Sequence, residues 1–137
     1  MKESVQIAVS LVKSMFPDKA EMFDKNDLHI HVPDGAVPKD GPSAGITLTT
    51  ALSSLVTGHS VSPQLAMTGE VSLRGVVSPI GGLPEKLMAA KRAGVSKVFI
   101  PAENTQELED IADEVKNDLM IIPVNTVKDV LTQAHIL

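Results

Sequence analysis

Glycine and proline are concentrated in two segments of this 137-residue chain, at residues 33–45 and 75–84. Glycine relaxes the backbone and proline removes a hydrogen-bond donor, so a long regular helix or strand through either segment is disfavoured. Each segment is therefore expected to form a shaped loop between regular elements. Any fold of this chain must place these two loops, and the side chains that they carry are the first candidates for a functional site.

Helical and strand patterns alternate in the rest of the chain. A 3.6-residue apolar repeat predicts a helix that Ser4 caps and that runs to about Ser14, and alternation predicts a strand at residues 27–32, ended by Pro33. The other predicted helices are 43–56, 83–93, 104–115 and 126–134, and the other predicted strands are 65–71, 75–79, 97–100 and 119–122. This order predicts the α/β (α+β) class, with residues 1–137 forming a single compact domain on a mixed sheet.

The composition excludes several classes of function. The chain has no cysteine, which rules out disulfides, thiol nucleophiles and thiolate metal sites, and its 2% of aromatic residues gives no base-stacking surface. Its net charge of −5 comes without a Lys/Arg run, which disfavours nucleic acid as a partner. No apolar stretch is long enough to cross a membrane, and the first residues lead into a helix rather than a signal peptide. We therefore expect a cytoplasmic protein with no membrane partner.

Ser43 is the serine whose surroundings best suit a nucleophile. It follows Gly41 and Pro42 in the motif Lys39-Asp-Gly-Pro-Ser-Ala-Gly45, at the junction of a loop and a predicted helix. Its small neighbours allow a substrate carbonyl to approach, and the N-terminus of the helix could stabilise an oxyanion. The simpler interpretation is that Ser43 only caps the helix, which is the common role of a serine at such a junction.

A nucleophilic serine also needs a base, and the four histidines are weak candidates. His29 and His31 share one face of a predicted strand and could form a metal pair, but no third Cys or His lies nearby, which favours a supporting role. His59 and His135 resemble surface residues. A Ser-His-Asp triad stays open on spacing alone.

Lys86 is the alternative base. It lies early in a predicted helix, after Gly81-Gly82 and among apolar neighbours. A lysine accepts a proton only when neutral, so its pKa must fall from about 10.4 toward roughly 7–8. Burial against apolar walls near a helix N-terminus provides such a shift. Without other information, a solvated helix lysine is the simpler interpretation.

Three motifs that occur in order along the chain favour the catalytic interpretations of Ser43 and Lys86. The motif around Ser43, the stretch Met67-Thr-Gly-Glu-Val-Ser-Leu-Arg-Gly75 and the stretch Gly81-Gly-Leu-Pro-Glu-Lys86 closely resemble the proteolytic, C-terminal domain of the ATP-dependent Lon protease family. The resemblance covers nearly the whole chain. It implies the Lon proteolytic-domain fold and a serine endopeptidase that degrades unfolded or damaged proteins in protein quality control.

The resemblance also implies a Ser-Lys catalytic dyad. Ser43 would be the nucleophile and Lys86 the general base, with no part for histidine or metal. Thr68 matches a family position near the lysine amine, where its hydroxyl would orient Lys86 and help to keep it neutral. Asp40 matches a family aspartate close to the site, and as an anion it could instead pair with Lys86 and hold it charged in an off state.

Other family positions carry less specific implications. Glu70 and Arg74 match family positions, and for them a surface or subunit-contact role is as compatible with the sequence as a catalytic role. His29 and His31 match family histidines that are expected to support the site. Pro84 replaces a lysine that is common in the family, and proline suits the first turn of a helix. We expect the dyad to tolerate this change.

The resemblance implies that this domain belongs to a larger ATP-dependent protease. No Gly-x-x-x-x-Gly-Lys-Ser/Thr loop is present, so we expect no cofactor here, with ATP and Mg²⁺ confined to a separate ATPase module. The proteolytic domain is expected to be truncated at its N-terminus. The family implies a homohexameric ring as the parent assembly and unfolded protein or peptide as the substrate.

Two interpretations from other classes remain. A non-catalytic Lon-like domain, used for ring assembly or a DNA-associated function, would be expected to lose the serine or the lysine and to gain basic charge, whereas this acidic chain keeps both residues. A phosphate-binding α/β domain would use the glycine-rich loops as cradles, but the loop around Gly41 lacks the required spacing.

Overall fold

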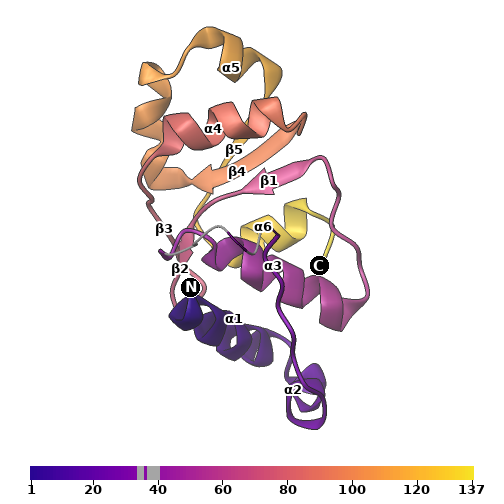
Figure 1. Ribbon diagram of the computed structural model, residues 1–137. Helices are drawn as coiled ribbons and strands as arrows, with labels where there is room; N and C mark the ends of the chain where they lie inside the picture. Colours follow the sequence, from indigo (N-terminus) through magenta and orange to yellow (C-terminus); the bar gives the residue numbers. More distant parts are fainter. Residues whose placement is uncertain (34–35, 37–40) are drawn as a thin grey trace.

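The computed structural model describes residues 1–33, 36 and 41–137. Its elements in chain order are α1 (Lys2–Met15), the 3-10 helix η1 (Pro17–Lys19), α2 (Glu21–Lys25), α3 (Gly45–Thr57), β1 (Leu65–Met67), β2 (Glu70–Val71), β3 (Val77–Ser78), α4 (Leu83–Arg92), β4 (Lys97–Pro101), the 3-10 helix η2 (Ala102–Asp110), α5 (Asp113–Asp118), β5 (Met120–Val124) and α6 (Val127–Gln133). Figure 1 shows their arrangement.

The strands pair in both directions. β1, β4 and β5 form a parallel sheet in the order β1-β4-β5, while β2 and β3 form an antiparallel pair. Helices connect the parallel strands, as parallel pairing requires. The predicted α/β (α+β) class is therefore confirmed.

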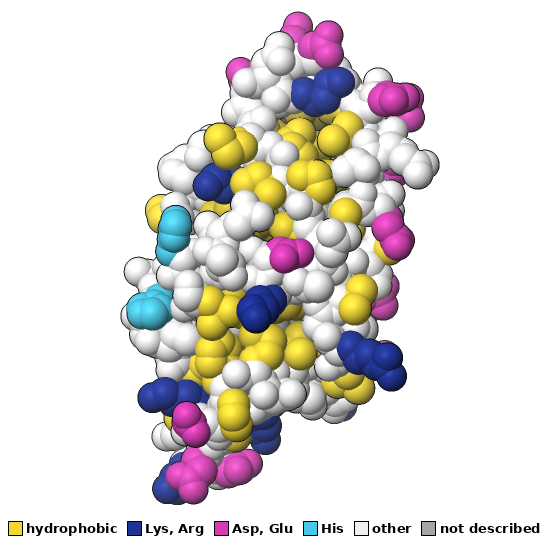
Figure 2. All heavy atoms as spheres, turned by 180° about the vertical axis from the view of Figure 1, so that it is seen from behind, with side chains coloured by type: hydrophobic (Ala, Val, Ile, Leu, Met, Phe, Trp, Pro, Cys, Tyr) yellow, Lys and Arg dark blue, Asp and Glu magenta, His cyan; other side chains and the backbone are white. Residues whose placement is uncertain are grey.

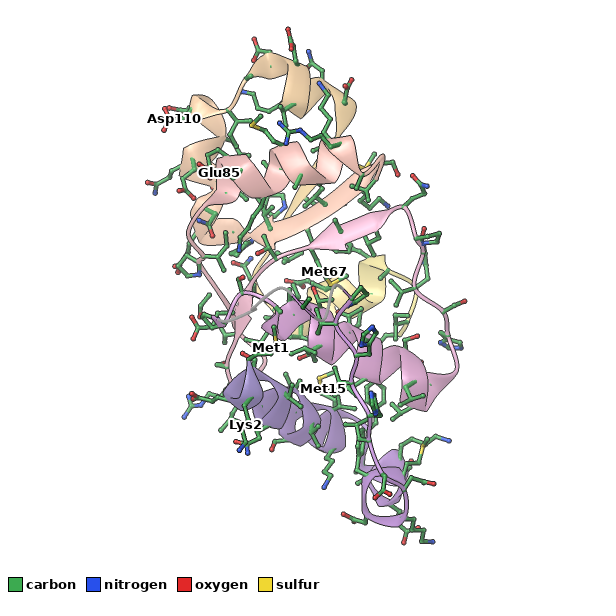
Figure 3. The ribbon with its side chains drawn as sticks, viewed as in Figure 1. Met1, Lys2, Met15, Met67, Glu85 and Asp110 are labelled. Atoms are coloured by element: carbon green, nitrogen blue, oxygen red, sulfur yellow. The ribbon has the colours of Figure 1, made fainter. Side chains whose placement is uncertain are left out.

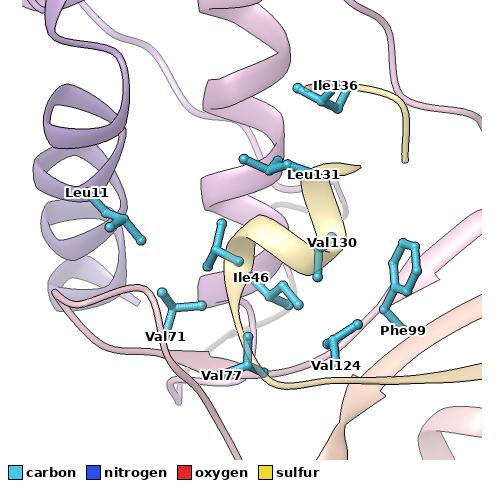
Figure 4. Packing of buried hydrophobic residues seen from close by; sticks show 10 residues of the cluster. Leu11, Ile46, Val71, Val77, Phe99, Val124, Val130, Leu131 and Ile136 are labelled. Atoms are coloured by element: carbon cyan, nitrogen blue, oxygen red, sulfur yellow. The ribbon is translucent and has the colours of Figure 1, made fainter. Parts of the chain in front are cut away.

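Helices cover both faces of the parallel sheet. In Figure 1, α4 and α5 lie on one side of the sheet, α6 and α3 lie on the other, and α1 packs along α3. The central strand β4 contributes to both sides, because Val98 and Ile100 join the cluster around α4 while Phe99 joins the cluster around α6. This alternation follows from the two-residue period of a strand. Figure 4 shows Phe99 packed with Val124, Val130 and Ile46.

Residues 27–32 do not form the predicted strand. The structure shows no regular element there, and the apolar side chains of Leu28 and Val32 are 40% and 37% exposed. Alternation defines two faces, but a strand also needs a neighbour to complete its hydrogen bonds. No described residue pairs with this segment. The prediction of a strand is therefore wrong for this structure.

Three further element predictions need correction. Ser4 is not an N-cap, because α1 begins at Lys2 and Ser4 is buried within it. The predicted strand 65–71 is divided into β1 and β2, which belong to different sheets. The predicted helix 104–115 is a 3-10 helix followed by α5, because Ile111 and Ala112 are extended and interrupt it. This bend lets Ile111 join the apolar cluster around α4.

The surface carries no continuous apolar belt on the face that Figure 2 presents. Acidic side chains gather mostly toward its two ends, and hydrophobic side chains reach the surface between them. Among the helices of the described segments, none has both the length and the apolar character that a bilayer crossing requires.

Candidate active site

Ser43 lies in a turn immediately before α3. The helix begins at Gly45 with Ala44 as its N-cap, and no side chain caps it. The capping interpretation of Ser43 is therefore wrong. Within the described part of the chain, the Ser43 hydroxyl has no hydrogen-bond partner, and the side chain is only partly buried. This leaves the hydroxyl available for chemistry.

Gly69 holds the Ser43 turn in place from the side. Its backbone N–H donates to the Ser43 carbonyl at 3.0 Å, and its own carbonyl accepts from the Ile46 N–H at 3.1 Å. Gly69 thus provides a hydrogen-bond partner for the Ser43 carbonyl and for the Ile46 N–H, which is otherwise unpaired in the first turn of α3. These two bonds attach the serine turn to the chain segment that leaves the end of β1.

Thr68 immediately precedes Gly69 and contacts Lys86. Its backbone N–H donates to the Phe99 carbonyl of β4 at 3.1 Å, which extends the parallel ladder by one step beyond β1. The Lys86 Nζ donates to the Thr68 Oγ1 at 3.3 Å, toward the long end of the hydrogen-bond range. Thr68 is 7% exposed, so its hydroxyl is fixed in the protein interior. The structure thus joins Lys86, Thr68, Gly69 and Ser43 through a short series of contacts.

The environment of Lys86 makes protonation of its amine less favourable than in water. Burial lowers the pKa of Lys86 from its ordinary value of 10.5, because the protonated amine loses hydration. No carboxylate of the described residues forms an ion pair with it. The shift has the direction that a general base requires.

Lys86 owes its position to the start of α4. Gly82 adopts a left-handed conformation at φ 71°, which suits glycine, and proline occupies the first turn of the helix. The Lys86 N–H donates to the Gly82 carbonyl at 3.1 Å. The lysine therefore lies on the first turns of the helix, directly after the glycine loop, and Figure 3 labels its neighbour Glu85 at this end of α4.

Asn104 fixes the loop from which α4 begins, and the sequence analysis missed it. The Asn104 amide accepts from the Ile80 N–H at 2.9 Å and donates to the Ile80 carbonyl at 2.9 Å. Its amide nitrogen also donates to Glu107. Asn104 is 5% exposed, and leaving this amide unpaired in the interior would cost about 1–3 kcal/mol. No local sequence pattern distinguishes this asparagine, because its main partner belongs to another part of the chain.

No histidine forms a hydrogen bond with Ser43, Thr68 or Lys86 among the residues that the structure describes. His29 and His31 are exposed on the segment 27–32. The Nδ1 atom of His59 lies 2.8 Å from the Ile136 carbonyl, which ties the loop after α3 to the C-terminal residues. His135 is exposed with φ 61°. No group of three metal-ligating side chains occurs among the residues that the structure describes.

The remaining predicted residues are Glu70, Arg74 and Asp40. Glu70 in β2 and Arg74 in the turn after it are both exposed. Glu70 helps to line a cavity of about 310 Å³ between α1 and the Ser43 turn, where Pro42 and Ile7 also contribute. Asp40 lies outside the described residues, so its predicted role stays a prediction.

Gly69 leads to a prediction about packing at the site. A Cβ atom added at Gly69 would lie 2.7 Å from the Val77 Cγ1, closer than real Cβ contacts allow. Gly69→Ala is therefore expected to lower the free energy of unfolding by about 1–3 kcal/mol, since residue 69 and Val77 of β3 must move apart. Denaturant unfolding measures this loss.

Gly81→Ala is the matched control for this change. A Cβ at Gly81 meets nothing within 4 Å, so its stability is expected to stay close to that of the unchanged protein. Equal stability of the Gly69→Ala variant and the unchanged protein would contradict the packing argument.

Comparison with known proteins defines the class of this domain. The chain matches the family model of the Lon protease (S16) C-terminal proteolytic domain over residues 1–136. It is 60% identical over 133 residues to the Lon protease of Clostridium beijerinckii, covering 97% of this chain. It is 53% identical over 136 residues to the Lon protease of Methanosarcina barkeri, covering 98% of this chain.

These matches identify a protease domain. The chain belongs to the Lon protease C-terminal proteolytic domain family, and the resemblance drawn from its three motifs is confirmed. The chain spans 17% of the length of each of these two curated relatives.

Proposed function

We propose that this chain is the serine endopeptidase domain of an ATP-dependent protease that degrades unfolded or damaged proteins through a Ser43–Lys86 dyad. One observation carries the proposal: a lysine with a lowered pKa contacts Thr68, and the next residue holds the Ser43 turn. The family match supports a peptidase, and this arrangement supports the assignment of the dyad.

The proposed reaction begins with proton transfer between the two residues. Neutral Lys86 takes the proton of the Ser43 hydroxyl as the oxygen attacks the scissile carbonyl carbon. Protonated Lys86 then gives this proton to the leaving amine as the C–N bond breaks, which yields an acyl-enzyme. Water attacks the acyl-enzyme with Lys86 again as the base, and Ser43 regains its proton as the acid product leaves.

Two neighbours assist this cycle in the proposal. Thr68 orients the Lys86 amine through its hydroxyl, and because this hydroxyl is uncharged it stabilises the protonated lysine less than a carboxylate would. The positive end of α3, which begins two residues after Ser43, favours the negative charge that develops on the substrate oxygen. Asp40 is proposed to hold Lys86 charged in an off state.

The family supplies the wider setting of the proposal. The relatives are Lon proteases, each about six times as long as this chain. We therefore propose that an ATPase module, which binds ATP and Mg²⁺, threads unfolded substrate to this domain. We also propose assembly as a homohexameric ring and a cytoplasmic location. The chain itself is proposed to need no cofactor for peptide hydrolysis.

The pH dependence of peptide cleavage tests the assignment of the base. Because only neutral Lys86 accepts the serine proton, kcat/KM is expected to rise with pH along one limb, with an apparent pKa below 10.5. The measurement uses a fluorogenic peptide and the full-length protein across neutral and alkaline pH. A limb with a pKa of about 6.5 that disappears when a histidine is replaced would instead identify a histidine base.

A further inference from the structure

A cavity of about 430 Å³ lies between α4 on one side and the end of η2 with the start of α5 on the other. Its floor is apolar, because Ile111 and Val115 line it and belong to the buried cluster around α4. Met88 of α4 also lines the cavity and is 42% exposed, so this apolar surface is open to solvent. Figure 1 shows α4 and α5 next to each other. The cavity shares no lining residue with the one beside Pro42.

The cavity lies on a different side of α4 from Lys86. Pro84, Met88 and Lys91 line it, and residues three and four positions apart share one face of a helix. Lys86 is two residues from both Pro84 and Met88, which places it about 160° around the helix axis from each of them. The cavity is therefore separate from the contact between Lys86 and Thr68.

Charged side chains of opposite sign lie at the two ends of the cavity. Lys91 and Arg92 line it where α4 ends, and Lys91 is paired there with Asp118 of α5 at 3.3 Å. Asp110 precedes α5, Glu114 lies in its first turn, and both also line the cavity. Figure 3 labels Asp110 at the end where α4 begins. The cavity is therefore acidic toward the start of α4 and basic toward its end.

Three of these charged groups are available to a ligand. Arg92, Asp110 and Glu114 are exposed, and none of them forms an ion pair within the segments that the structure describes. A guanidinium group binds a carboxylate through two parallel hydrogen bonds, and a carboxylate binds an ammonium group. The cavity thus offers a partner for a carboxylate at one end and for an ammonium group at the other, with apolar surface between them.

The distance between the two ends sets the length of the ligand. Pro84 and Arg92 both line the cavity, and the eight residues from one to the other correspond to about 12 Å along a helix. An extended peptide advances about 3.3 Å per residue, so three or four residues span this length. A free amino acid carries its ammonium and carboxylate groups on one carbon atom and cannot reach both ends.

We propose that this cavity binds an apolar peptide of three or four residues whose N- and C-termini are both free. The terminal carboxylate pairs with Arg92, and the terminal ammonium group pairs with Asp110 and Glu114. The apolar side chains of the peptide lie against Met88 and Ile111. Hydrolysis of peptide bonds creates both kinds of terminus, so the source of the ligand, though not its binding, rests on the proposed endopeptidase function.

The charged ends of the cavity distinguish this ligand from other apolar molecules. An interior segment of an unfolded chain has neither terminus and gains no contact with these ends. A fatty acid has a carboxylate alone, and its apolar tail would lie beside Asp110 and Glu114, which would cost these carboxylates part of their hydration. The site therefore favours released peptides over intact chains and lipids.

NMR of the methionine methyl groups tests the binding. The full-length protein carries Ser43→Ala to prevent cleavage, and the probe is the tripeptide leucyl-alanyl-leucine with both termini free. The Met88 methyl signal, assigned by Met88→Leu, is expected to shift until the site is saturated. The Met120 methyl group is the internal control, because Met120 is 60% exposed on β5 and does not line the cavity. Absence of a saturable shift at Met88 would overturn the proposal.

Blocking the two termini of the peptide tests the recognition of charge. Acetylation of the N-terminus and amidation of the C-terminus are each expected to weaken binding by about threefold, the effect of one exposed ion pair. In the Arg92→Gln variant, amidation is expected to have no further effect, while acetylation keeps its effect. The double variant Asp110→Asn, Glu114→Gln is expected to show the reverse. Equal affinity for the free and the doubly blocked peptide would contradict the proposal.

Lys128→Gln is the matched control for the loss of a positive charge. Lys128 is an exposed residue of α6 and does not line the cavity. This variant is expected to bind the free peptide as the unchanged protein does and to keep both blocking effects. If Lys128→Gln and Arg92→Gln weaken binding equally, the cavity does not hold the carboxylate.

The cleavage assay separates this proposal from the proposed function. If Ser43→Ala abolishes cleavage while the Met88 methyl signal does not shift, the dyad stands and the cavity does not bind the peptide. If Ser43→Ala retains full cleavage while the Met88 signal shifts and the blocking effects hold, the cavity binds the peptide and the proposed function fails. Both measurements use the same full-length preparation.

Discussion

Replacing Ser43 with alanine is expected to reduce kcat/KM for peptide cleavage by a factor of at least about 10⁴, because the acyl-enzyme can no longer form. The melting temperature is expected to stay the same, since the Ser43 hydroxyl has no hydrogen-bond partner among the described residues. Hydrolysis of a fluorogenic peptide and thermal unfolding of the same preparation provide the two measurements.

Ser10→Ala is the control for this change. Ser10 is an exposed residue of α1, and its replacement is expected to leave both activity and stability unchanged. Cleavage by the Ser43→Ala variant at the rate of the control would show that another residue is the nucleophile.

Replacing Lys86 with methionine is expected to reduce kcat by about 10²–10⁴-fold, the usual contribution of a general base. Methionine keeps the apolar packing of the lysine stem and removes only the amine. Lys86→Arg is expected to be equally inactive, because a guanidinium group does not lose its proton in proteins. The rising limb of the pH profile is expected to disappear in both variants, which a merely structural role of Lys86 would not cause.

Lys91→Met is the matched control on the same helix. Lys91 forms a surface ion pair with Asp118 at 3.3 Å, and such pairs contribute about 0–1 kcal/mol. Its replacement is expected to leave kcat and the pH profile unchanged. If Lys86→Met and Lys91→Met have the same kcat, Lys86 is not the base.

The sequence predicted elements best where local signals agree with packing. The helix that begins at Leu83 follows two glycines and ends before Gly94, and the structure places α4 there with Gly94 at φ 78°. The strand near residues 97–100 is a run of buried residues, and β4 is the central strand of its sheet. In both cases the pattern and the tertiary environment favour the same conformation.

The failures arose where the outcome depends on distant partners. Residues 27–32 alternate like a strand, but no described neighbour completes their hydrogen bonds. The stretch from Leu65 to Val71 is apolar throughout most of its length, but it leaves β4 after Thr68 because Gly69 bonds to the Ser43 turn instead. Local periodicity contains no information about either event.

At the candidate site, too, local motifs could be predicted from the sequence, whereas contacts between distant segments could not. The motifs singled out Ser43, Thr68 and Lys86, and the structure links the latter two directly and the first through Gly69. The backbone role of Gly69 and the amide of Asn104 were not predicted, because both depend on contacts between segments that the fold brings together.

The Asn104 amide makes the start of α4 depend on a later part of the chain. Asn104 and Ile80 are 24 residues apart, so these two hydrogen bonds of the loop before α4 require the chain through Asn104. A shorter nascent chain already contains the serine, the threonine and the lysine, but its α4 helix lacks this anchor. The position of the proposed base thus depends in part on a residue that lies 18 positions further along the chain than Lys86.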